Sequence, residues 1–165
     1  MNILFRSLAL AIALFALAAC NKGAEEKKPA EAAPVVLTAP TDGNDQAWKE
    51  YLKGVIKEHM KGLRGQAYPY YLPSSAAADF EDQYNRQLDN VSATVARTVT
   101  PGNMLAFGSP ESARMADIVI ESFKNAEAGS FKGVKVLFIG KAEDGERVRV
   151  AVEPSGAEYV FVEAK

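Results

Sequence analysis

Between residues 46 and 62 the apolar residues recur every three or four positions, which predicts an amphipathic helix. Trp48, Leu52 and Val55 lie on its apolar side, and Asp45 is the expected N-cap. Lysines occupy every fourth position on the other side: Lys49, Lys53, Lys57 and Lys61. Because four residues advance a helix about 40° past one full turn, the four ammonium groups form one slowly winding stripe.

The next segment, residues 66–73, is rich in aromatic residues and contains two prolines, which prevent a helix. We expect a stiff loop there. Four of its residues are candidates for contact with a partner protein: Tyr68, Tyr70, Tyr71 and Leu72. Tyrosine suits such a role because it covers a large area with few rotatable bonds. The alternative is that these rings fold back over the edge of the core.

A second helix is expected after an N-cap at Ser74 or Ser75. Its apolar residues again follow helical spacing: Phe80, Tyr84, Leu88, Val91 and Val95. Residues 94–100 fit a helix or a strand equally, and Pro101 and Gly102 end whichever element is formed.

The central part of the chain contains the clearest strand and helix signals. Residues 104–107 form an apolar run of strand length, and residues 133–140 form the strongest strand pattern in the chain. Between them, Ser109, Pro110 and Glu111 have the composition of a helix start, with Ser109 as N-cap. The helix that follows is apolar on more than one side, so we expect it to be the most buried helix.

The C-terminal part supports two interpretations. Asp144 and Gly145 form a hairpin signal, residues 147–150 alternate, and residues 159–162 form a further strand pattern. These signals favour an α+β fold, in which two N-terminal helices and a central helix pack on a small sheet with a C-terminal three-stranded meander. Val148, Ala151 and Val152 also fit a short helix, and that alternative is an α/β fold with successive βαβ units.

The N-terminus has the organisation of an export signal. Arg6 is followed by an apolar run over residues 8–19, which is too short to span a bilayer. The run ends in the sequence Leu17-Ala18-Ala19-Cys20. This motif resembles the lipobox of bacterial lipoproteins. The resemblance implies that the Cys20 thiol carries a fatty acyl group such as palmitate, and that Cys20 is the first mature residue. Asn21, in place of an aspartate, implies transport to the outer membrane, with the protein on its periplasmic face.

These signals divide the chain into residues 1–19 as a lipoprotein signal peptide, 20–45 as a lipid-anchored disordered tether, and 46–165 as one globular periplasmic domain. The tether composition is charged and rich in Ala and Pro, so it cannot bury enough apolar surface to fold. We expect its one apolar cluster, residues 35–37, to be loop without fixed contacts. The net charge of −2 gives no basic domain of the kind that binds nucleic acid.

Little in the sequence points to catalysis. His59 is the only histidine and lies on or beside an apolar helix face, so we expect it to be packed in the core. Cys20 is the only cysteine, and the sequence contains no Gly-x-Ser-x-Gly motif and no Asp-x-Asp-x-Asp loop. We therefore expect no catalytic residues, no metal site and no cofactor, and a chain that is not an enzyme.

A binding role remains, and partner contact is expected at the aromatic segment and at the lysine stripe. The stripe suits an acidic partner or anionic lipid, although Glu50 and Glu58 also fit a solvated helix face. The architecture of the chain resembles that of immunity lipoproteins, which neutralise toxins delivered by type IV or type VI secretion systems. A general sequence likeness to them covers residues 105–109 and 134–140. That resemblance implies binding of a secreted toxin. The alternatives are an accessory lipoprotein of an envelope assembly or secretion machine, and, with least support, an envelope hydrolase.

Overall fold

The computed structural model describes residues 37–165, and its centre is a sheet of four parallel strands. The strands lie side by side in sequence order: β1 (Ala67–Tyr71), β2 (Met104–Gly108), β3 (Lys135–Gly140) and β4 (Glu158–Glu163). β1 and β4 are therefore the two edges of the sheet, and β2 and β3 are its interior.

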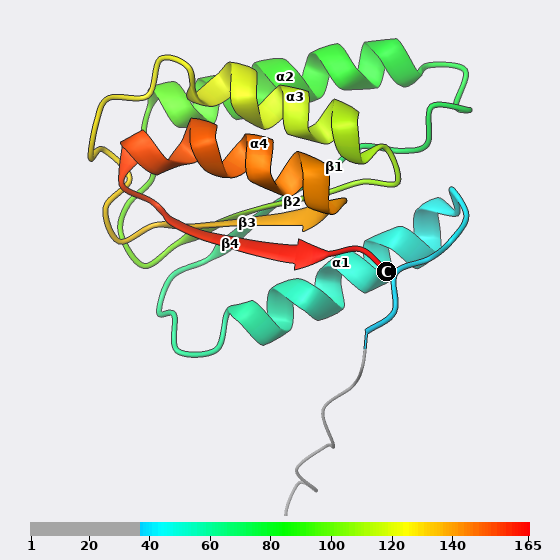
Figure 1. The fold of residues 1–165 in the computed structure, drawn as a ribbon, viewed down its shortest axis with the longest axis horizontal. Helices are drawn as coiled ribbons and strands as arrows, with labels where there is room; N and C mark the ends of the chain where they lie inside the picture. The colour runs from blue at the N-terminus through cyan, green and yellow to red at the C-terminus, as the bar shows by residue number, and fades with distance from the viewer. Residues whose placement is uncertain (1–36) are drawn as a thin grey trace, which may run out of the picture. The chain divides into compact units, whose positions relative to one another are not determined.

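Helices cover both faces of this sheet (Figure 1). The helices are α1 (Asp45–His59), α2 (Phe80–Ala96), α3 (Ser112–Phe123) and α4 (Ala142–Val152), and a short 3₁₀ turn, η1 (Glu153–Ser155), follows α4. Each of α2, α3 and α4 connects one strand to the next, and right-handed crossovers that advance in one direction place their helices on one face. α1 precedes the first strand and packs on the other face.

Two apolar cores result, one on each face of the sheet. Leu105, Phe107 and Phe138 are fully buried toward α2, α3 and α4. The intervening residues of β2 and β3 are equally buried on the α1 side, where they meet Trp48, Leu52 and Val55: Met104, Ala106, Leu137 and Ile139. Because both faces are buried, the sequences of these two strands are continuous apolar runs.

The expected fold class, α+β with a C-terminal meander, is wrong. Asp144 and Gly145 lie in the first turn of α4, and residues 147–150 continue that helix. The expected strand at residues 159–162 exists as β4, but it pairs with β3 in parallel, with Val136 opposite Tyr159. The molecule has the successive βαβ units of the alternative interpretation.

Contacts with neighbouring elements explain why residues 142–152 are helical. Val148 is completely buried on the inner side of α4, and Arg147 on its flank donates to Asp144 at 3.0 Å and to Asp117 of α3 at 2.6 Å. Gly145, expected in a hairpin turn, lies against the ring of Phe161, where an added Cβ would come within 2.5 Å of the ring. The glycine therefore permits close helix–strand packing.

The segment expected as a stiff loop, residues 66–73, contains strand β1. The carbonyl of Gln66 accepts a hydrogen bond from Met104 N at 2.9 Å. In a parallel ladder alternate residues bond the same neighbour, so Tyr68 and Tyr70 also direct their backbone toward β2. Pro69 then directs its backbone to the open edge, where its missing N–H breaks no ladder bond.

Helix starts differ from those expected. Asn44 rather than Asp45 caps α1, with its side chain accepting from Ala47 N at 2.9 Å. The second helix begins at Phe80 rather than after Ser74 or Ser75, and residues 94–96 belong to it.

The third helix also starts later than expected. Ser109 does not cap α3, because that helix begins at Ser112. The Ser109 hydroxyl instead accepts from Glu111 N at 2.8 Å and donates to Leu72 O at 2.9 Å, which joins the ends of β1 and β2.

Residues 37–44, expected within the tether, contact the domain. Ala39 N donates to Lys165 O at 3.1 Å, and the indole N–H of Trp48 donates to Asp42 O at 2.8 Å. Leu37 lies over Gly54, where an added Cβ would come within 2.9 Å of the leucine side chain. Residues 1–36, including the signal and most of the expected tether, lie outside the described residues. Within residues 37–165 no helix has the length and hydropathy needed to cross a membrane.

We predict that a chain beginning at residue 46 is less stable than one beginning at residue 37. The shorter chain loses the contacts of Leu37 and Ala39 and leaves the Trp48 indole without its carbonyl, a loss of about 1–3 kcal/mol. Thermal unfolding of both chains measures the difference, which should be several degrees. Equal melting temperatures would show that residues 37–45 add no stability.

Candidate binding groove

An apolar groove of about 390 Å³ lies between α1 and the edge strand β1. It is lined by Lys49, Leu52, Lys53, Ile56, Ala67, Pro69 and Tyr71. Almost all of the lining comes from carbon atoms of these side chains, and the lysine ammonium groups lie at its rim.

The local sequence explains the groove. Side chains alternate across a strand, so Ala67, Pro69 and Tyr71 face α1 while their neighbours face the other helices. Ala67 and Pro69 are small, and they do not fill the space between the sheet edge and the side chains of Leu52 and Ile56. The helix periodicity that buries Leu52 also places Ile56 one turn later, at the wall of the groove.

Tyr71 forms one end of the groove through a small polar cluster. Its hydroxyl donates to Asp45 Oδ1 at 2.8 Å, and Lys49 Nζ lies 5.2 Å from the centre of its ring. Burial and the hydrogen bond to Asp45 both raise the pKa of the Tyr71 phenol, which stays protonated at neutral pH. Tyr71 is therefore held in place with one ring face toward a lysine.

The lysine stripe runs along the exposed side of the groove. Lys49 lies 3.7 Å from Asp45 and Lys53 lies 3.8 Å from Glu50, and all four of these side chains are well exposed. Exposed ion pairs of this kind contribute about 0–1 kcal/mol. These lysines can therefore exchange their present partners for carboxylates of a bound molecule.

The two later lysines of the stripe lie beyond the groove. Lys61 pairs with Glu58 at 2.5 Å just after α1. Lys57 is exposed and forms no ion pair with any residue in the range 37–165. Lys57 therefore keeps its charge on the exposed side of α1 beyond the groove, whereas Lys61 is neutralised locally.

The structure separates the aromatic residues expected to contact a partner. Tyr71 lines the groove, and Tyr68 is exposed on the opposite face of the sheet. Tyr70 is buried, stacks on Phe107 at a ring distance of 5.0 Å, and donates to Thr94 Oγ1 at 3.0 Å. Leu72 is completely buried. Tyr70 and Leu72 are core residues, which corresponds to the alternative interpretation of this segment.

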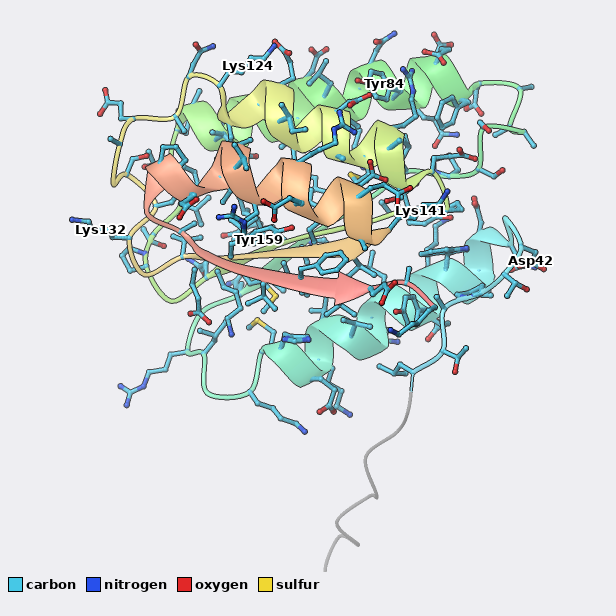
Figure 2. The ribbon with its side chains drawn as sticks, viewed as in Figure 1. Asp42, Tyr84, Lys124, Lys132, Lys141 and Tyr159 are labelled. Atoms are coloured by element: carbon cyan, nitrogen blue, oxygen red, sulfur yellow. The ribbon has the colours of Figure 1, made fainter. Side chains whose placement is uncertain are left out.

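A second cavity, of about 330 Å³, lies where the parallel strands end, the usual location of ligand sites in α/β folds. Asp42 and Lys141 are among its lining residues and lie at the same end of the molecule in Figure 2. Two of its serines form hydrogen bonds that hold the fold together. Ser112 Oγ accepts from Lys141 N at 2.8 Å, and Ser109 joins the ends of β1 and β2. No histidine or cysteine is among the residues that line this cavity.

His59 lies at the other end of α1, away from this cavity. It is half-buried, and burial followed by the positive charge of Lys135 lowers its pKa, so the neutral imidazole is favoured. Within residues 37–165 no group of histidine, cysteine and carboxylate side chains is arranged to hold a metal ion.

Comparisons with protein-family models, with curated proteins and with solved structures found no match to this chain. The groove is therefore interpreted from its own geometry. Sequence analysis identified Lys49, Lys53 and Tyr71 but missed Ile56 and Pro69. Pro69 carried a usable signal, because a proline within an alternating segment is typical of an edge strand.

We predict opposite roles for the two adjacent tyrosines. Tyr70→Ala should lower the free energy of unfolding by about 3–5 kcal/mol, because it empties a stacked core position. Tyr71→Phe should cost about 1 kcal/mol, the contribution of its hydrogen bond to Asp45. Urea unfolding of both variants tests this. A Tyr71→Phe loss as large as that of Tyr70→Ala would contradict the assignment of Tyr71 to a surface groove.

Proposed function

We propose that this chain is a lipid-anchored protein of the bacterial outer membrane that acts by binding another protein through the groove between α1 and β1. The observation that carries the proposal is the groove itself, an accessible apolar surface with lysines at its rim. The lipobox-like sequence ending at Cys20 supports the anchor and the periplasmic location, although it lies outside the described residues.

The groove favours a partner segment of mixed chemistry. One or two apolar side chains would enter between Ile56 and Pro69, and carboxylates would meet Lys49 and Lys53. Interfaces of this kind depend mainly on the desolvated apolar centre, while rim charges set the association rate and salt dependence. The proposed partner therefore presents an apolar residue flanked by acidic residues.

Within this function, we favour an immunity protein that neutralises a secreted antibacterial toxin. The support is the resemblance in build to immunity lipoproteins, together with a domain whose polar groups at the strand ends are engaged in the fold. Binding, not catalysis, is then the whole activity. An accessory role in an envelope assembly or secretion machine would use the same groove. An exported hydrolase encoded beside this gene would favour immunity, whereas neighbouring assembly genes would favour the accessory role.

We predict that groove variants weaken the complex in two distinct ways. Ile56→Glu should weaken binding by about tenfold or more at any salt concentration, because it places a charge in the desolvated centre. Lys53→Glu should weaken binding mainly at low salt. Calorimetry with the toxin encoded beside this gene, or with a partner purified from envelope extract, measures both effects.

Lys124→Glu is the matched control for these variants, since Lys124 follows α3 on the opposite face of the sheet and lies outside the groove. It should bind like the unchanged protein. Unchanged binding by a folded Ile56→Glu variant would contradict the groove as the contact site.

We predict that Cys20→Ser abolishes acylation and leaves the signal uncleaved by the lipoprotein peptidase, because the thiol is the acylated group in proteins with this motif. Metabolic labelling with a palmitate analogue, followed by membrane fractionation, measures the effect. Ser7→Ala, a change before the apolar run, is the control and should label normally. Undiminished label in Cys20→Ser would show that the cysteine is not the anchor.

A further inference from the structure

The two edges of the sheet differ in how they are protected. At β1, Pro69 has no N–H to offer, and the side chain of Gln87 donates to the outward carbonyl of Tyr71 at 2.7 Å. Proline and covering side chains are the usual means of preventing a further strand from pairing with an edge. The β1 edge is therefore closed to strand addition.

Within the part of the chain that the structure describes, the edge of β4 lacks such protection. Glu158 N donates to Val134 O at 2.8 Å and Ala164 N donates to Gly140 O at 2.9 Å, so even-numbered residues bond β3. In a parallel ladder the odd-numbered residues Tyr159, Phe161 and Glu163 then direct their N–H and C=O groups away from the sheet.

The residues described by the structure provide no hydrogen-bond partner for these outward groups, and β4 contains no proline. Only the last outward carbonyl, that of Lys165, is engaged, by Ala39 N at 3.1 Å. The open stretch is therefore 159–163, and Ala39 marks its end. An edge with unpaired N–H and C=O groups is a template on which a further strand can pair.

Apolar side chains accompany the open backbone on both faces. Phe161 is 36% exposed and lies 6.5 Å from the ring of Phe138. Tyr159 lies between α4 and β4, where its hydroxyl donates to Gly145 O at 2.7 Å (Figure 2). Val160 and Val162 are half-buried on the α1 side. A strand added here would cover aromatic surface on one face and valines on the other.

We propose that the occupant of this edge is a second copy of the same chain, paired through β4 in antiparallel orientation with the symmetry axis at Val160. In this register Tyr159 lies opposite Phe161 of the other copy, and both residues direct their backbone groups into the new ladder. Lys165 and Ala39 lie beyond the paired residues, so the contact between them is kept.

The charges of β4 do not oppose this self-pairing. Glu158 lies opposite Val162 and Glu163 lies opposite Ala157, so no carboxylate faces another directly. Tyr159 and Phe161 form cross-strand aromatic pairs on both sides of the axis. The strand is thus complementary to itself, as a twofold symmetric interface requires. The groove at β1 lies at the opposite edge of the sheet, so both copies keep it open.

Sedimentation equilibrium of residues 21–165, which contain the whole compact unit from residue 36 onward, tests the proposal. A single edge buries little area, so we expect a reversible dimer with a dissociation constant on the order of 1–100 µM. Phe161→Lys should weaken association by about tenfold or more, because an edge lysine opposes strand pairing. Val150→Lys is the matched control, since Val150 is 58% exposed on α4 and lies off the edge, and it should leave the dimer unchanged.

A cross-linking variant keeps the test independent of Phe161. Residues 21–165 contain no cysteine, and the Cα atoms of the two Val160 residues would lie roughly 4.5 Å apart in the proposed register. Val160→Cys should therefore form a disulfide-linked dimer on mild oxidation, whereas Val150→Cys should not. A protein that stays monomeric at about 500 µM, well above that range, would overturn the proposal. The proposal would also be overturned by two results together: a folded Phe161→Lys variant that still dimerises, and a Val160→Cys variant that does not cross-link.

Discussion

The burial of β2 and β3 on both faces is the constraint on which the rest of the structure depends. Parallel strands joined by right-handed crossovers receive all their connecting helices on one face when the strand order follows the chain. The other face must then be covered by an element outside the crossovers, and α1 is that element. Without it, Met104, Ala106, Leu137 and Ile139 would be exposed to water.

Covering that face with a single helix leaves space on both of its flanks. Four strands span roughly 15 Å between the outer strand axes, whereas a helix with its side chains is about 10 Å wide. On the β4 side the chain itself occupies the space, with Leu37 over Gly54 and Ala39 bonded to Lys165. On the β1 side none of residues 37–165 covers Ala67 and Pro69 in a comparable way, and the groove results. The candidate site and the docked segment at residue 37 thus have one geometric origin.

Several parts of this arrangement could be predicted from the sequence because they depend on local periodicity. The amphipathic pattern of residues 46–62 corresponds to α1, and the continuous apolar runs correspond to β2 and β3. α4 could not be predicted in the same way. Residues 147–150 alternate like a strand, whereas Val148, Ala151 and Val152 also fit a helix. The contacts that decide for the helix are the burial of Val148 and the hydrogen bond from Arg147 to Asp117 of α3. Those contacts join residues far apart in the chain, so no local pattern contains them.

For the candidate site, the sequence by itself determined which chemistry was present: tyrosines and a leucine beside two prolines, a lysine at every fourth position of one helix, and a single histidine. Only the tertiary structure decided which of these groups are accessible. Tyr70 and Tyr71 are adjacent and alike, yet one stacks in the core and the other lines the groove. The physical reason is that neighbouring residues of a strand face opposite sides of the sheet, and the elements covering each side come from distant parts of the chain.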